Sequence, residues 1–318
     1  MTGSSDMATV HDFTRRAARP TPGEALAEDV RWFTGSLIAG LFGRLAFDQV
    51  AYREIAASVD RTGRFARNFT DRGVRSFAHV ELMTFGDRAD IQEEIESLKQ
   101  KHRAVRGTGK DGFADTRYSA LSPDTWKWVA VSGINAIYQA YVHTAGRTLD
   151  PDEHEIVYQT IRVAIEPLEL PGQATKLPAT LIEMNEYYDG VARTKLADNE
   201  FLRFADRHFG ELPLPALIVP AALRPLLQPI WQLVLPFATR PPLICAAGAA
   251  HPRMRELLGP PQRPWHRYEF ALYTGLAGLA WRHLPRRLTL SPMAYNRFRY
   301  EKLRDLYRSI QLESFAAS

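Results

Sequence analysis

Helical spacing dominates this sequence, and the pattern of a β-sheet is missing from it. Two helix starts are explicit at Pro123 and Pro151, where a proline in the first turn is followed by an aspartate that suits the positive end of the helix dipole. No strand-length run of alternating Val, Ile, Thr and aromatic residues recurs, and no internal repeat has a fixed period. These patterns predict an all-α protein.

The helices are expected in segments separated by glycine, proline or polar residues. The expected helical segments are 24–54, the part of 61–86 that ends at Phe85-Gly86, 90–107, 122–144, a segment from 150 onward, 180–209 and 267–283. Residues 101–118 are rich in Gly, Lys and Arg and are expected to form a loop. Between 211 and 264, repeated prolines predict short turns of helix wrapped around a core.

The chain has the length of one large domain. Its 318 residues, 45% of them hydrophobic, are enough to bury a sizeable core and exclude a disordered protein. The polar start of the sequence ends at Pro20 and Pro22, where helical periodicity begins. We therefore expect residues 1–21 to form a mobile leader and residues 22–318 to form a single helical domain.

Charge and cysteine content exclude several kinds of protein. The 40 basic and 36 acidic residues are interspersed and form no basic arm, so we expect no nucleic-acid partner. Cys245 is the single cysteine, which excludes an intramolecular disulfide, a zinc ribbon, a thiolate-bound iron–sulfur cluster and haem attached through C-x-x-C-H. We expect an inert buried thiol at this position.

Nothing in the sequence predicts export or a membrane span. Arg15 and Arg16 are not followed by the apolar core of an export signal, so the cytoplasm is the expected compartment. The longest uncharged apolar stretch, 225–239, is shorter than the ~20 residues that a membrane-spanning helix needs, and prolines interrupt it. Within 212–248, core packing is the expected role, with a substrate channel or peripheral contact with a membrane as alternatives. The sequence does not determine an oligomeric state.

Two neighbouring helices place polar residues where core residues are expected. Arg72, Ser76, His79 and Met83 share one stripe of the first helix, because they follow one another at steps of four, three and four. The common nucleotide-binding, serine hydrolase and zinc protease motifs are absent from the chain. This polar stripe is therefore a candidate site.

His102 continues an apolar stripe of the second helix. It follows Ile91, Ile95 and Leu98 at helical spacing, so its imidazole should point into the protein and needs a hydrogen-bond partner or a metal. From these residues alone, the alternative is a hydrogen-bonded core histidine next to a salt-bridged arginine.

Short motifs occur along the chain in a fixed order, which is a more specific signal than helical periodicity. The motifs are Arg72-x-x-x-Ser76, Phe85-Gly86, His102-Arg103-Ala104-Val105-Arg106-Gly107, Tyr118-Ser119-Ala120-Leu121-Ser122-Pro123, Trp128-Val129, Tyr187-Tyr188 and the stretch 257–265. Their order resembles the catalytic domain shared by latex clearing protein (rubber oxygenase) and the mpaB-type oxygenases. The resemblance covers residues 22–285.

The resemblance implies a single helical domain that encloses a pocket for non-covalent haem b. His102 matches the family's axial iron ligand, and His79 is the alternative ligand within this chain. Arg72 and Ser76 match an arginine and a threonine near the haem, and serine keeps the hydroxyl. These two are the candidate catalytic residues, and Arg106 joins Arg72 as a candidate clamp for the haem propionates.

The activity implied is oxygenation with dioxygen of a hydrophobic substrate, isoprenoid-like or acyl-like, with cleavage of a carbon–carbon double bond. Three positions depart from the family pattern: Phe47-Asp48 replaces His-Pro, Ala130 replaces a histidine, and Ala56 stands where rubber oxygenases have a catalytic glutamate, with Glu54 the nearest acid. These departures favour the alternative of a haem-binding sensor or carrier without turnover. A third alternative is a helical interaction module without a cofactor.

Three acids in the first part of the chain could form a carboxylate metal site. Asp48, Glu54 and Asp60 lie close in sequence, but the spacing of Asp48 and Glu54 puts them on different faces of a helix. Solvated charges are therefore the expected role of these three residues.

Overall fold

A computed structural model describes residues 20–61, 69–212, 214, 219–258 and 263–316. Most of the leader expected over 1–21 lies outside the described residues. The elements up to residue 144 are α1 (Pro22–Thr34), the 3-10 helix η2 (Leu37–Ala46), α2 (Phe47–Ala51), α3 (Arg53–Asp60), α5 (Phe69–Phe85), α6 (Arg88–Arg103), β1 (Arg106–Thr108), η3 (Asp111–Phe113), β2 (Arg117–Ser119) and α7 (Pro123–Thr144).

The second half of the chain is also helical. Its elements are α8 (Pro151–Ile165), η4 (Glu166–Leu168), η5 (Gln173–Thr175), α9 (Leu181–Thr194), α10 (Glu200–Phe209), η6 (Ala221–Leu223), α11 (Arg224–Ala249), α12 (Pro252–Leu258), α13 (His266–His283), α14 (Arg286–Thr289) and α15 (Pro292–Ala316). The prediction of a mostly helical protein is confirmed.

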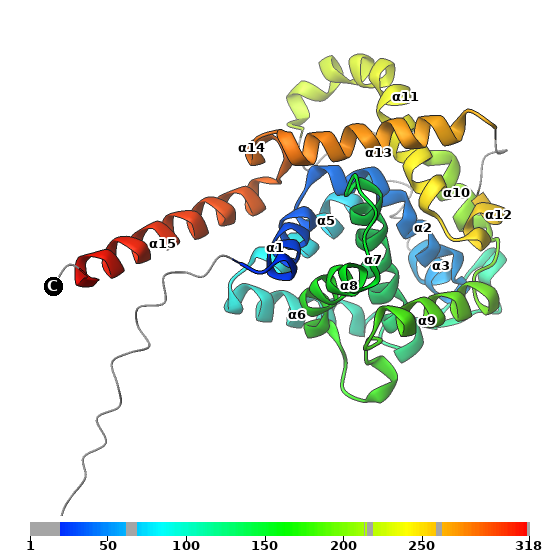
Figure 1. Ribbon diagram of the computed structural model, residues 1–318. Helices are drawn as coiled ribbons and strands as arrows, with labels where there is room; N and C mark the ends of the chain where they lie inside the picture. The colour runs from blue at the N-terminus through cyan, green and yellow to red at the C-terminus, as the bar shows by residue number, and fades with distance from the viewer. Residues whose placement is uncertain (1–19, 62–68, 213, 215–218, 259–262, 317–318) are drawn as a thin grey trace, which may run out of the picture.

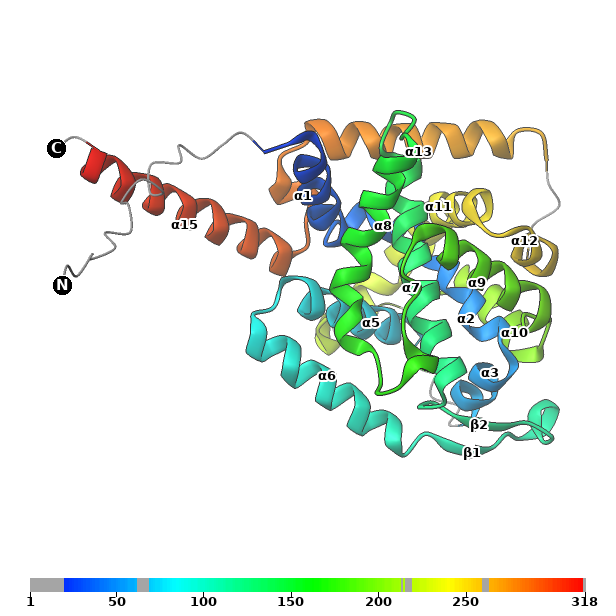
Figure 2. The same ribbon diagram turned by 60° about the horizontal axis from the view of Figure 1, so that its bottom comes forward.

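Helix α7 lies in the middle of the helical body (Figures 1 and 2). Trp128, Val131 and Ile134 on this helix have no exposed surface. Burying a large apolar side chain stabilises the fold by roughly 1.5–3 kcal/mol. Phe33 of α1 lies edge-on to Tyr141 of α7, with ring centroids 5.3 Å apart. The long apolar helix expected over 122–144 is therefore the centre of the core.

The sequence signals for helix starts have structural counterparts. α7 begins at Pro123 and α8 at Pro151, as expected. Three helices begin with a reciprocal capping box, in which the side chains of the cap and of the third helical residue each accept a main-chain N–H; the pairs are Thr21 with Glu24, Asp87 with Asp90 and Asp150 with Glu153. A capping side chain stabilises a helix by about 1 kcal/mol.

A short β-hairpin corrects the expectation of an entirely α-helical chain. Strands β1 and β2 pair antiparallel, with Gly107 opposite Tyr118, inside the segment 101–118 that was expected to be a loop. The hairpin lies beside α3 at one edge of the molecule (Figure 2). Strands of three residues are too short to show an alternating pattern, and their hydrogen bonds depend on a partner strand.

The expectation of broken helical turns between 211 and 264 is wrong for residues 224–249. These residues form one helix, α11, with Pro229, Pro236, Pro241 and Pro242 inside it. Figure 1 shows α11 following a bent course across the top of the molecule. Each proline removes one main-chain hydrogen bond without ending the helix here, and the last turns are held by packing of buried residues such as Cys245.

Two further boundaries differ from the predictions. The expected helix 180–209 is two helices, α9 and α10, separated by residues 195–199. The last helix, α15, lies beyond the final helix expected from the sequence and projects away from the body (Figures 1 and 2). Apolar and charged residues alternate too closely in α15 to mark a core-facing stripe.

Among the described residues, no helix has the length and apolarity to cross a membrane.

Candidate functional site

Helices α5 and α6 form an antiparallel pair that carries the candidate haem residues. The turn between them is tight: a Cβ added at Gly86 would lie 2.4 Å from the carbonyl oxygen of Leu82. The side chain of Asp87 caps α6 by accepting hydrogen bonds from the main-chain N–H groups of Ala89 and Asp90. Glycine and the cap therefore reverse the chain within two residues and bring the two helices side by side.

His102 lies in the last turn of α6 and is half-buried. Its Nδ1 donates a hydrogen bond to the main-chain carbonyl of Leu98, at 2.7 Å. Its ring lies edge-on to Trp126 of α7, with centroids 5.6 Å apart. Because a carbonyl only accepts, this hydrogen bond requires a proton on Nδ1, and Nε2 is the ring nitrogen that could bind a metal. Axial histidines usually have this arrangement.

His79 of α5 has a comparable arrangement with a carboxylate partner. Its Nδ1 lies 2.8 Å from Oε1 of Glu94 on α6. Its Nε2 is buried and has no hydrogen-bond partner among the described residues. A buried polar nitrogen without a partner is costly. The structure therefore leaves His79 as a second nitrogen with the chemistry of an axial ligand.

The antiparallel register places Arg72 and His102 at the same end of the helix pair. Arg72 precedes His79 by seven residues, and His102 follows Glu94 by eight. Each is therefore two turns, about 10 Å, from the contact between His79 and Glu94, in the same direction. Arg72 lies in the first turn of α5, and its side chain is outside the described part of the structure.

The other two predicted residues lie at the surface near this end. Ser76 lies on α5 with its side chain exposed, so the expectation of a core position is wrong for this residue, whereas Met83 at the end of the same stripe is buried. Arg106 begins β1, four residues after His102, and is exposed. Ser76 and Arg106 are thus accessible to a ligand and are not held within the core.

Two of the positions that depart from the family pattern hold alanines, which supply no acid or base. Ala56 on α3 is fully buried, and Ala130 on α7 is half-buried. Glu54 lies in the first turn of α3, half-buried. Cys245 is buried, and its burial raises the pKa of the thiol to about 12, which confirms an inert thiol.

Asp48 is a buried carboxylate, so the expectation of a solvated charge is wrong for this residue. It is 1% exposed and accepts hydrogen bonds from Ser132 Oγ at 2.7 Å and from the Tyr188 hydroxyl at 2.5 Å. Its burial raises its pKa to about 6, against the opposing effect of these hydrogen bonds. The partners come from α7 and α9, which spacing within one helix cannot reveal.

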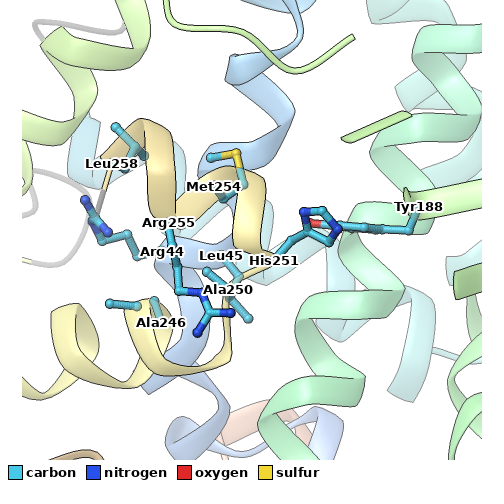
Figure 3. Close-up of a pocket in the computed structure, with 10 residues that line it drawn as sticks. Arg44, Leu45, Tyr188, Ala246, Ala250, His251, Met254, Arg255 and Leu258 are labelled. Atoms are coloured by element: carbon cyan, nitrogen blue, oxygen red, sulfur yellow. The ribbon is translucent and has the colours of Figure 1, made fainter. Parts of the chain in front are cut away.

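A small cavity adjoins this cluster. It has a volume of about 20 Å³, and Figure 3 shows the residues around it, with the rings of Tyr188 and His251 on one side. His251 Nε2 lies 2.9 Å from Asp189 Oδ1, and its Nδ1 accepts from the N–H of Arg253 at 3.1 Å. Both nitrogens of His251 are therefore used, which leaves no lone pair for a metal.

Sequence spacing predicts neither the cluster nor the cavity. A usable signal in the sequence is Asp48 itself, an acid in the segment 45–51, whose other residues apart from Gln49 are apolar. A buried acid of this kind requires hydrogen-bond donors from elsewhere in the fold.

The helical architecture agrees with the catalytic domain that the ordered motifs predict. The chain matches the family model described as "ER-bound oxygenase mpaB/B'/Rubber oxygenase, catalytic domain" over residues 28–280. The chain therefore belongs to the mpaB/rubber oxygenase catalytic-domain family, as the resemblance over 22–285 indicated. No curated protein matches the chain significantly, and no solved structure does.

Proposed function

We propose that this protein is a haem b-dependent oxygenase that uses dioxygen on a hydrophobic substrate, isoprenoid-like or acyl-like, with cleavage of a carbon–carbon double bond. One observation carries the proposal. His102, which matches the family's iron ligand, is half-buried at the end of α6, and the hydrogen bond from its Nδ1 to the Leu98 carbonyl sets the orientation of its ring. Family membership supplies the oxygenase class.

The residues of this chain would bind and orient the cofactor. His102 would hold the iron through Nε2, and the edge of Trp126 would limit rotation of the imidazole ring. Arg72 and Arg106 would neutralise the propionates, and the accessible hydroxyl of Ser76 would donate a hydrogen bond to one of them. Haem, when bound, supplies the reaction with dioxygen.

His79 is the second candidate for the axial ligand. The buried Nε2 without a described partner favours it, and the carboxylate of Glu94 beside Nδ1 would make the ring more basic than a carbonyl does. His102 is preferred because it matches the family motif. The main-chain carbonyl of Leu98 already accepts the proton of its Nδ1, so its ring is oriented without a carboxylate.

A haem-binding sensor or carrier is the alternative function. It is favoured by Ala56, which is buried where the rubber oxygenases have a catalytic glutamate, and by the engagement of Asp48 with Ser132 and Tyr188. A buried carboxylate that already accepts two hydrogen bonds is a poor candidate to replace that glutamate. Haem binding would then persist without oxygen consumption.

The test is haem binding followed by oxygen uptake, both with the full chain. Purified protein is titrated with hemin, its absorption is recorded before and after dithionite, and a pyridine haemochrome assay identifies the haem. We expect one haem b per chain and oxygen consumption with squalene or oleic acid. Stoichiometric haem without oxygen consumption supports the sensor, and a protein that ignores hemin contradicts both proposals.

A further inference from the structure

The positive charge of this chain is concentrated in one part of it. Residues 212–290 contain nine arginines, no lysine and only two acids, Glu256 and Glu269. The whole chain has 40 basic and 36 acidic residues. Outside this segment there are 31 basic and 34 acidic residues, so the rest of the chain has a surplus of acids. The segment includes helices α11 to α14.

The first half of α11 exposes large apolar side chains within this basic segment. No charged residue occurs from 225 to 239. The exposed apolar residues of this stretch, with their exposed fractions, are Leu226 (69%), Ile230 (56%), Leu233 (74%), Val234 (48%) and Phe237 (80%). Exposed apolar residues grouped in this way are typical of surfaces that bind another protein or a membrane.

Helix α13 adds a second apolar stripe. Its exposed large apolar residues, which recur at steps of four, four and three, are Tyr268, Leu272, Leu276 and Leu279. The opposite side of α13 is buried through Ala277 and Trp281, so the stripe faces outward. An ion pair of 2.7 Å between Arg240 and Glu269 joins α11 to α13. Figure 1 shows both helices at the top of the molecule.

We call these nine side chains and the two helices that bear them the α11–α13 face. Exposed arginines lie on or next to α13: Arg263, Arg267 and Arg287 form no ion pair with an acid among the described residues, and Arg282 donates a hydrogen bond to the Ala145 carbonyl. Trp265 is also half-exposed beside them. Aromatic and basic residues around an apolar face are typical of proteins that rest on the interface of a lipid bilayer.

We propose that the α11–α13 face docks on an anionic lipid surface. Apolar side chains would enter the region between the headgroups and the acyl chains, and the arginines would contact lipid phosphates. Charge selects this occupant over a second copy of the chain, because a two-fold interface would bring two arginine-rich surfaces together with little acid between them. Docking of this face on lipid would require neither bound haem nor catalytic turnover.

The test measures binding of the full chain to vesicles by flotation. Phosphatidylcholine vesicles are compared with vesicles that also contain about 30% phosphatidylglycerol. We expect binding at least tenfold tighter to the anionic vesicles, falling as salt rises from about 0.1 to 0.5 M because salt screens the charges. Equal binding to both vesicles, or no binding to either, overturns the proposal.

Matched variants localise the contact. Phe237→Asp should weaken binding to anionic vesicles at least tenfold, whereas Ile182→Asp, on α9 and 70% exposed, should not. Replacing both Arg263 and Arg287 by Gln should weaken it about tenfold or more, whereas Arg193→Gln on α9 should not. Equal losses in the α9 controls contradict this surface.

The oligomeric state distinguishes a lipid surface from a second copy of the chain as the occupant of the face. Sedimentation velocity of the wild-type chain and of Phe237→Asp, together with circular dichroism to check folding, distinguishes lipid docking from self-association. We expect the same species for both proteins. A wild-type dimer that Phe237→Asp dissociates shows that a second copy covers the face, and the lipid proposal is then wrong.

Discussion

The hydroxyl of Tyr188 lies 2.5 Å from the carboxylate of Asp48, which is 140 residues earlier in the chain. Ser132 donates to the other oxygen of the same carboxylate. Three helices, α2, α7 and α9, thus meet at one buried acid.

Asp48 should make the stability of the fold depend on pH. Its pKa is raised from 3.8 to about 6 by burial, so the folded protein holds this proton more tightly than the unfolded chain. The free energy of unfolding should therefore fall by about 3 kcal/mol as pH rises from 3 to 7, with about 2 kcal/mol of this between pH 4 and 6. Asp48→Asn should flatten this dependence in urea titrations across pH. Glu96→Gln, exposed on α6, is the control; an unchanged slope in Asp48→Asn would contradict the assignment.

Tyr188→Phe removes one of the two side-chain donors to Asp48. We expect the free energy of unfolding to fall by about 1–3 kcal/mol at pH 7, because a buried carboxylate loses a partner. The pKa of Asp48 should rise further. Chemical denaturation at pH 5 and 7 measures both effects. Tyr187→Phe changes the adjacent, half-buried ring and should cost less; a larger loss in that control would show that the hydrogen bond is not the cause.

His102→Ala should abolish tight binding of haem. Loss of the axial nitrogen should weaken binding at least tenfold and change the absorption spectrum, and hemin titration followed by absorption spectroscopy measures both. His79→Ala should leave the spectrum unchanged, and so should His283→Ala at the end of α13. The reverse pattern, a changed spectrum only in His79→Ala, would identify His79 as the iron ligand.

Gly278 allows α13 to approach α7. A Cβ at this position would lie 2.5 Å from the carbonyl oxygen of Thr144, whereas a Cβ at Gly275 on the same helix would meet nothing within 4 Å. Gly278→Ala should therefore lower the free energy of unfolding by about 1–3 kcal/mol. Gly275→Ala should raise it by about 0.5–1 kcal/mol, because alanine favours a helix. Thermal unfolding of the pair measures the difference, and equal changes would exclude a close contact.

Local signals were sufficient for much of the fold. The starts of α7 and α8 follow from a proline and neighbouring acids, and the end of α5 follows from Gly86. His102 could be selected because its spacing continues an apolar stripe. These features depend on residues within one or two turns of each other, so the chain itself displays them.

The remaining features depend on contacts that spacing does not contain. The β-hairpin requires two three-residue strands to find one another, and α11 persists through four prolines. Helix α15 lacks a stripe that would predict it. The functional roles of Arg72, Ser76 and Arg106 stay predictions, since they depend on where haem binds relative to α5 and β1.

The helical class and the main helix starts could be read from the residues in order, because they follow from local propensity and from spacing along single helices. The choice of His102 and His79 as candidate ligands depends in addition on the resemblance of the ordered motifs to the family. Packing between helices makes two further features: Asp48 is buried with Ser132 and Tyr188, and large apolar side chains are exposed on α11 and α13, which the ion pair between Arg240 and Glu269 joins. The physical reason is that burial, hydrogen-bond partners and surface charge depend on which helices pack together, and distant segments of the chain supply those helices.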